Sequence, residues 1–212
     1  MKAALLPDRG VVKVTGDGAR SFLNGLFTAD IGKVAPDTPR FAALLTPQGK
    51  IILDAIIAEA AADVGATLVE AADYEAQRIA LGVPRGGLDF IYGDAFPHET
   101  DMDQLNGVDF DKGCFVGQEV VSRMEHRGLA RTRIVPIAYE GFAPDAGAAV
   151  TAAEKPVGTF GSSAKGRALA LLRLDRAADA LAAGHDLVAG SVTLRLIKPD
   201  WARFAFPGDA KG

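Results

Sequence analysis

The residues best suited to chemistry lie together in one stretch with the sequence KGCFVGQE (residues 112–119), which holds the only cysteine of the 212-residue chain. Lys112 stands two residues before Cys114, where a cation can favour the thiolate, the form of cysteine that attacks substrates and binds metals. Gly113 and Gly117 flank the cysteine, and glycine takes positive φ at little cost. Two interpretations stay open: a functional thiol, or a free cysteine that packs as a small buried residue.

A helix is predicted directly after the cysteine, over residues 118–127. Glu119 lies in its first turn, where the helix dipole favours an acid, and Arg123 and Arg127 lie farther along, where it favours bases. Glu119 and Arg123 also stand four residues apart with the acid first, which is the more stabilising order. Gly128 is typical of a helix end. A thiol on a glycine-flanked loop just ahead of a helix N-terminus is suited to thiol chemistry or to anion binding.

The chain before this motif alternates strand and helix patterns, which predicts an α+β domain. The expected elements are a strand at 11–14, a helix from Asp17 or Gly18 with Phe22, Leu23, Leu26 and Phe27 on one apolar face, paired strands at 41–45 and 51–57, a short strand at 66–70, and a helix at 71–81 that ends at Gly82. A proline turn at 46–49 joins the paired strands.

Residues 86–111 carry seven acidic side chains and no lysine or arginine. His98 and Glu99 with Asp101 and Asp103 offer ligands for a hard cation, but their spacing matches no known loop. We therefore interpret the segment as a solvated acidic loop and expect no metal. The lysine and arginine side chains that follow can form ion pairs with this loop, or can bind an anionic ligand or RNA.

From residue 132 onward, short apolar segments alternate with glycine turns, which predicts a small β-barrel or sandwich. The expected strands are 134–138, 157–160, 168–174, 187–188 and 192–197, with one short helix at 175–181. We place the boundary at 128–130, which gives an N-terminal domain (1–128), a C-terminal barrel (129–206) and a disordered tail (207–212).

The composition is that of a globular protein, with a net charge of −4 that does not suit a surface for coating nucleic acid or an anionic membrane. A single cysteine cannot form an internal disulfide, which fits a reducing compartment. The N-terminus lacks the apolar stretch of a signal peptide, and the run from 51 to 62 is too short and too charged to span a bilayer. The sequence therefore predicts a cytoplasmic protein without membrane contact.

The motif at 112–119, followed by Arg123, resembles the signature of the YgfZ family. Members of this family are folate-binding relatives of the glycine-cleavage T-protein, an aminomethyltransferase, and are implicated in the maturation or repair of iron–sulfur proteins, including enzymes that modify tRNA. The resemblance extends to residues 11–30, 45–50, 78–84 and 96–99, and to the C-terminal segment. It implies an α+β fold with folate held in the N-terminal part, followed by a β-barrel. The region between 57 and 72 is much shorter than the family's middle subdomain, which puts the folate pocket in question.

The resemblance also implies which residues act. The motif residues Lys112, Gly113, Gly117, Gln118, Glu119 and Arg123 surround Cys114, the candidate functional thiol. Tyr74 would line the folate pocket, where a flat pterin can stack on an aromatic ring. The looser candidates for folate contact are Arg9, Asn24, Thr28, Asp30, Lys50 and Asp54.

The leading functional hypothesis is a tetrahydrofolate-binding accessory protein for iron–sulfur enzymes, with tRNA as a further candidate partner. The alternative is a folate-dependent one-carbon transferase of the aminomethyltransferase type, in which Asp54 positions or deprotonates the amine. The T-protein enzymes carry two adjacent aspartates where this chain has one, and they lack the cysteine motif. A third hypothesis is a thiol enzyme that pairs Cys114 with a base. His126 would lie roughly 18 Å along the helix by helical rise, which leaves His98 as the candidate base.

Overall fold

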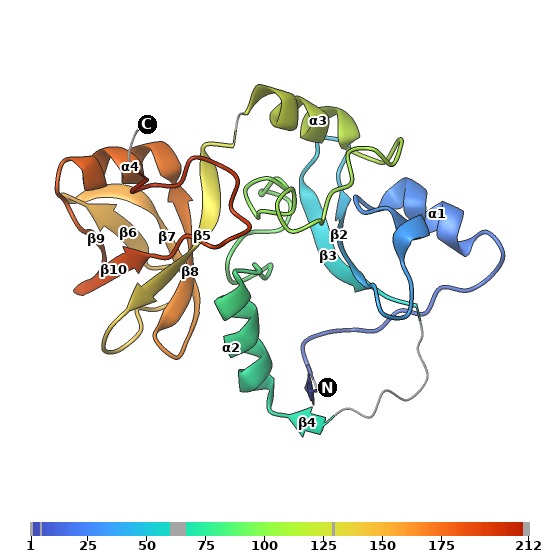
Figure 1. The fold of residues 1–212 in the computed structure, drawn as a ribbon, viewed down its shortest axis with the longest axis horizontal. Coiled ribbons are helices and arrows are strands. Elements are labelled where there is room, and N and C mark those ends of the chain that lie inside the picture. The colour runs from blue at the N-terminus through green and yellow to red at the C-terminus, as the bar shows by residue number, and fades with distance from the viewer. Residues whose placement is uncertain (1, 5, 60–66, 129, 210–212) are drawn as a thin grey trace.

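The computed structural model describes residues 2–4, 6–59, 67–128 and 130–209 of the chain. Figure 1 shows an N-terminal lobe, in which helices surround a hairpin, and a C-terminal barrel beside helix α2 (Ala71–Leu81). The expected α+β fold with a C-terminal barrel is confirmed. Within the described ranges, no helix combines the length and apolar character needed to cross a membrane.

The N-terminal lobe is organised on an antiparallel hairpin of β2 (Arg40–Leu45) and β3 (Ile51–Ile57), with a bulge between Leu44 and Leu45. Its proline turn is closed by hydrogen bonds from Thr46 N to Lys50 O (2.8 Å) and from Gly49 N to Thr46 O (2.9 Å). The hairpin is therefore the one predicted from the sequence. The smaller elements of the lobe are α1 (Ala19–Leu26), a 3₁₀ turn η1 (Ile31–Lys33), and a parallel pair of β1 (Lys2–Ala4) with β4 (Thr67–Val69).

Two helices frame the functional motif, and both begin and end where the sequence predicted. Helix α2 ends at Gly82, which has φ of +74°. Helix α3 (Gln118–Arg127) begins after Gly117, with φ of +82°, and ends at Gly128, with φ of +58°. Only glycine takes these left-handed angles without a steric cost, so glycine fixes three of the four helix boundaries.

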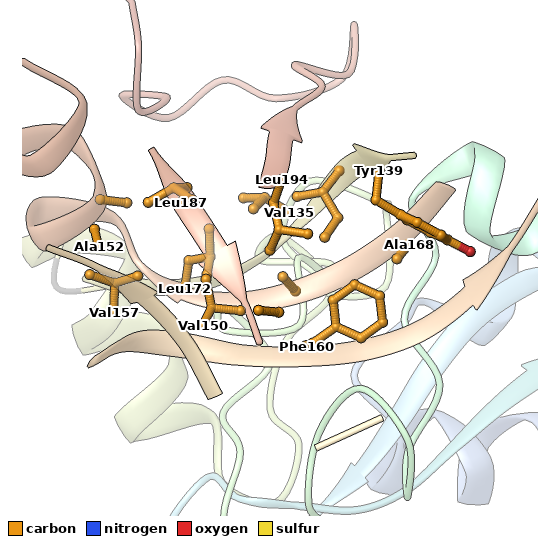
Figure 2. Close-up of a cluster of buried hydrophobic side chains, with 14 of the residues drawn as sticks. Val135, Tyr139, Val150, Ala152, Val157, Phe160, Ala168, Leu172, Leu187 and Leu194 are labelled. Atoms are coloured by element: carbon orange, nitrogen blue, oxygen red, sulfur yellow. The ribbon is translucent and has the colours of Figure 1, made fainter. Parts of the chain in front are cut away.

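The C-terminal barrel is closed, with strand order β10-β5-β8-β7-β6-β9. Its strands are β5 (Thr132–Tyr139), β6 (Ala149–Ala152), β7 (Lys155–Ala164), β8 (Arg167–Arg173), β9 (Leu187–Ala189) and β10 (Val192–Leu196), and helix α4 (Leu174–Ala182) follows β8. Figure 2 shows the core, in which Phe160 packs among Val135, Leu172 and Leu194. Strand β6 was not predicted, because four residues with two alanines give a weak strand pattern.

Two predictions for the N-terminal lobe are wrong. Residues 11–14 form no strand, and Val11 and Val12 are 98% and 86% exposed, because no sheet edge is present there to pair with this β-branched run. The apolar face of α1 does not build core either. None of the helix residues is buried, and Phe22 is 62% exposed.

The acidic segment 86–111 is not a solvated loop, so that interpretation is wrong as well. His98, Thr100, Asp101 and Met102 are fully or almost fully buried within it. The physical reason is Arg133 on β5, whose guanidinium pairs with Asp101 at 3.0 Å and with Asp103 at 2.7 Å. Buried acids are tolerated where a cation and hydrogen bonds compensate for the lost water.

The two lobes are joined through buried polar contacts. Arg78 on α2 is 4% exposed and donates to Asp89 at 3.0 Å and to Ser162 Oγ on β7 at 2.8 Å. Asp89 in turn accepts from the backbone and hydroxyl of Ser162, both at 2.7 Å. Trp201 Nε1 donates to Leu81 O at 3.0 Å. These bonds fix α2 against the barrel.

The turn of the hairpin and the start of α3 approach each other backbone to backbone. A Cβ atom placed on Gly117 would lie 2.6 Å from Thr46 O and 3.1 Å from Gly49 Cα. Real Cβ atoms do not approach that closely, so the contact exists only because residue 117 is glycine. It sets the position at which α3 begins, and with it the position of the cysteine loop.

This contact yields a prediction with a matched control. Gly117→Ala should destabilise the protein by about 2–5 kcal/mol, because it adds both a left-handed alanine and a clash with rigid backbone. Gly113→Ala should cost only about 1–2 kcal/mol, because Gly113 also has positive φ but faces open space. Urea unfolding of both variants measures the difference. Equal destabilisation would show that the backbone contact does not matter.

Candidate functional site

Cys114 is a free cysteine at the surface. The next residue, Phe115, is buried in a core that the N-terminal lobe shares with Ile134 of β5 and Leu169 of β8, and its N–H donates to Gln118 Oε1 at 3.3 Å. The interpretation of Cys114 as a packing residue is therefore wrong, because Phe115 fills the core in its place. The thiol stands on an anchored loop, open to solvent and to other molecules.

The ammonium of Lys112 has a structural role that the sequence did not indicate. Its Nζ donates to the carbonyl oxygens of Asn24 at 2.5 Å, Ala29 at 3.0 Å and Phe27. An ammonium has three donors, so these carbonyls use them all and none is directed to the sulfur of Cys114. Burial lowers the pKa of Lys112, and the nearby carboxylates of Asp30 and Asp109 offset part of that effect. Lys112 thus anchors the loop through these three carbonyls.

Three of the loosely predicted folate residues belong to this anchoring region. Thr28 is fully buried, donates to Gly107 O at 2.5 Å and accepts from Ala43 N at 2.8 Å. Asn24 accepts from Ile31 N at 2.9 Å, and Asp30 accepts from Gly32 N at 2.9 Å. These side chains hold the segment that carries the three carbonyls bound by the Lys112 ammonium. The structure gives them a structural role.

The other folate candidates fall into a second group around Asp54 on β3. The Asp54 side chain is only 5% exposed and pairs with Arg9 Nη1 at 3.4 Å. Tyr92 donates its hydroxyl to Asp54 Oδ1. Tyr74, on α2 and half-buried, lies close enough to influence the Arg9 guanidinium. Arg9 and Tyr92 are thus both in direct contact with Asp54, and the folate role of Arg9, Asp54 and Tyr74 stays a prediction.

Tyr92 was missed by the sequence analysis. The available signal was an aromatic residue with a polar tip in a glycine-containing turn, which is too common to be decisive. Burial and the hydrogen bond to Asp54 raise the pKa of Tyr92 to about 12. Lys50 is separate from this group, because its ammonium lies 3.4 Å from the centre of the Phe96 ring and donates to Asp94 O.

The remaining motif and base candidates take surface or structural roles. Glu119 and Arg123 form the expected i,i+4 ion pair on α3, which is exposed and hence contributes little stability. His98 does not approach the cysteine as a base, because it is 1% exposed and its Nε2 lies 3.0 Å from Glu125 Oε2. The described residues thus offer no histidine base that contacts the thiol.

The barrel matches a known family model. Residues 131–204 match the family model described as CAF17, C-terminal beta-barrel domain. The mitochondrial iron-sulfur cluster assembly factor IBA57 of Mus musculus is 35% identical over 137 residues, which are 61% of this chain and 37% of that protein. The homolog in Neurospora crassa is 48% identical over 80 residues, which are 37% of this chain and 18% of that protein. The chain therefore spans well under half the length of these relatives.

The fold has a solved counterpart. The crystal structure of the glycine cleavage system aminomethyltransferase T from Bartonella henselae superposes with a TM-score of 0.66 at 13% identity, over 90% of this chain and 83% of that one. The chain thus has a T-protein-like fold. The expected cytoplasmic location is contradicted, because the relatives named above are mitochondrial proteins. A single cysteine excludes an internal disulfide but does not distinguish between compartments.

The hydrogen bond between Tyr92 and Asp54 gives a pH-dependent prediction. Folding raises the pKa of Tyr92 from 10.0 to about 12, so the protonated hydroxyl stabilises the folded state. This stabilisation is fully present below pH 10 and is lost as the pH rises through 12. Of the three tyrosines in the chain, one should ionise near pH 12 in an ultraviolet absorbance titration. Tyr92→Phe should remove that step, and Asp54→Asn should move it toward lower pH. A step that persists in Tyr92→Phe would assign it to another tyrosine.

Proposed function

We propose that this protein is a YgfZ-related factor for the maturation or repair of iron–sulfur proteins, with Cys114 as its working thiol and a reduced folate bound beside Asp54. The observation that carries the proposal is the exposed Cys114 on a loop held by buried anchors. The names of the relatives, iron-sulfur cluster assembly factors, support the same class of client. Enzymes that modify tRNA include iron–sulfur proteins of this kind. The proposed effect on tRNA modification therefore acts through these client enzymes and does not require this protein to bind tRNA.

The anchors give the thiol a fixed position. On one side Lys112 binds three carbonyls, and on the other Phe115 is buried and Gly117 contacts the hairpin turn. A loop held in this way loses little conformational freedom when a partner binds, which favours complex formation. A thiolate is a soft ligand that suits iron and copper. Cys114 can therefore reach a metal centre or a reactive group on another protein.

The Asp54 group has the chemistry of a folate site. A reduced pterin offers N–H donors that a carboxylate can accept, and a flat ring that can stack on Tyr74. Arg9 pairs with Asp54 at 3.4 Å and would hold this carboxylate in position for the pterin. Arg9, Asp54 and Tyr74 lie on three different segments of the N-terminal lobe, and the folate proposal requires all three to face one ligand.

Aminomethyl transfer is the weaker candidate. A carboxylate that positions or deprotonates an amine must be free to meet it. Asp54 already accepts a hydrogen bond from Tyr92 and pairs with Arg9. A transferase role would require both contacts to open, whereas simple binding of a folate can use them as they stand.

The thiol is tested by Cys114→Ser. Because the side chain is exposed, the free energy of unfolding should change by no more than about 0.5 kcal/mol. Activity of iron–sulfur enzymes in cells that depend on this protein should nevertheless be lost, since serine supplies no soft ligand and no redox-active sulfur. Val116→Ser, at a neighbouring exposed position of the same loop, is the control and should retain support. Full support by Cys114→Ser would remove the thiol from the proposal.

The folate site is tested by calorimetric titration with tetrahydrofolate. Tyr74→Ala should weaken binding by about tenfold or more, because stacking and the buried ring area are lost together. Tyr74→Phe keeps the ring and should bind within a factor of about three. Equal affinity of wild type and Tyr74→Ala would exclude stacking on Tyr74. A wild-type protein that does not bind tetrahydrofolate would leave a thiol factor without a folate site.

A further inference from the structure

A second polar cluster lies where the acidic segment meets the barrel and the end of α3. Arg133 on β5 donates to His98 O at 2.8 Å, to Asp101 at 3.0 Å and to both oxygens of Asp103 at 2.9 and 2.7 Å. Its guanidinium carbon lies 4.5 Å from the centre of the Phe204 ring. The cluster is separate from the Cys114 loop and from the Asp54 group, and neither part of the proposed function uses it.

The cluster is incomplete in hydrogen bonding. Among the described residues, four buried side-chain polar atoms have no hydrogen-bond partner, and three of them lie here: His98 Nδ1, Asp101 Oδ2 and Arg133 Nε. Buried polar groups in proteins are paired with rare exceptions, because an unpaired one costs about 1–3 kcal/mol. Of the three, Nδ1 of His98 is the atom that can bind a cation, because Arg133 Nε is a donor, and the His98 ring is 1% exposed and holds this unpaired nitrogen inside the cluster.

Three side chains are arranged as metal ligands. One atom each from His98, Asp103 and Glu125 can be chosen so that all lie within 4.8 Å of one another. Ligands bound at about 2.0–2.2 Å in a tetrahedral site lie about 3.3–3.6 Å apart. His98 Nε2 and Glu125 Oε2 are already 3.0 Å apart, so ion binding requires adjustment of the side chains and no change of backbone fold. The Glu125 side chain, on α3 and 45% exposed, is free to make that movement.

The charge of the cluster favours a cation. One guanidinium, on Arg133, faces the carboxyl groups of Asp101, Asp103 and Glu125. Even when the fully buried Asp101 is left out of the count, the carboxyl groups of Asp103 and Glu125 stand against a single guanidinium. A divalent ion would reverse this imbalance without displacing Arg133, because carboxylate ligands commonly accept hydrogen bonds as well.

The site opens into a cavity of about 980 Å³ between α3, α4 and the C-terminal segment. His98, Glu125 and Arg133 form part of its wall, and the apolar part is formed by Met124, Leu174, Leu181, Phe204 and Phe206. Two of the three ligands, His98 and Glu125, line this space, so an ion bound to them keeps coordination positions for water or a small ligand, whereas a structural site is closed by its protein ligands.

We propose that His98, Asp103 and Glu125 bind a divalent first-row transition ion at the mouth of this cavity. One imidazole nitrogen with two carboxylate oxygens is a donor set for Zn²⁺, Mn²⁺, Fe²⁺ or Co²⁺, whereas Mg²⁺ and Ca²⁺ take oxygen ligands alone. Ion binding through either nitrogen of the His98 ring leaves the other to donate to a carboxylate or water, as is usual for metal-bound histidines. The acidic segment thus supplies ligands that the sequence spacing alone did not indicate, because the third comes from α3.

The test is a titration of the full chain carrying Cys114→Ser, so that the thiol cannot act as a ligand. Zn²⁺ should bind with one ion per chain in calorimetry, and Co²⁺ should give visible d–d absorption that Zn²⁺ abolishes. Glu125→Gln in this background should weaken Zn²⁺ binding at least tenfold. Glu119→Gln on the same helix, 83% exposed and outside the cluster, should leave it unchanged. Both substitutions are at solvent-accessible helix positions and should preserve the fold.

His98→Asn provides a second variant, which should abolish the Co²⁺ spectrum. If it does not fold, the Glu125→Gln and Glu119→Gln pair decides alone. Absence of Zn²⁺ binding in the Cys114→Ser chain, or equal loss of binding in the two glutamate variants, would overturn the proposal.

Discussion

The position of the cysteine loop depends on one steric constraint, the contact between the hairpin turn and the first residue before α3. At Gly117 no side chain fits between the two backbones, and a Cβ atom on Gly49 would lie 3.0 Å from Cβ of Val120 on α3. The hairpin is in turn held by the buried core of the lobe. The core thus fixes the hairpin turn, the turn fixes the N-terminus of α3, and the helix N-terminus fixes the neighbouring cysteine loop.

The two groups of candidate residues differ in how the protein holds them. Cys114 is itself exposed while its neighbours are anchored, which suits contact with another macromolecule. Asp54, in contrast, is nearly enclosed and already bonded to Tyr92 and Arg9, which suits selection of a small ligand with matching donors. A single chain can therefore offer an open thiol and an enclosed carboxylate without either group constraining the other.

Local signals in the sequence predicted the parts of the structure that local physics decides. The helices at 71–81 and 118–127 and the proline-turn hairpin follow from periodicity, caps and turn residues, and all are present. The errors concern partners distant in sequence. Nothing local indicated that the Lys112 ammonium binds carbonyls more than eighty residues earlier in the chain. The acidic segment was expected to be solvated. Arg133, thirty residues after Asp103, donates hydrogen bonds to that carboxylate in place of water. Residues 11–14 have strand propensity and no strand to pair with.

The buried Arg78 at the lobe interface also has a thermodynamic consequence. If the barrel unfolded alone, Arg78 and Asp89 would lose their hydrogen bonds to Ser162. If the N-terminal lobe unfolded alone, the barrel would expose the surface that α2 covers. Either partly folded species loses contacts in both lobes. The two lobes should therefore melt as a single cooperative unit, with calorimetric and van't Hoff enthalpies that agree, despite their different architectures.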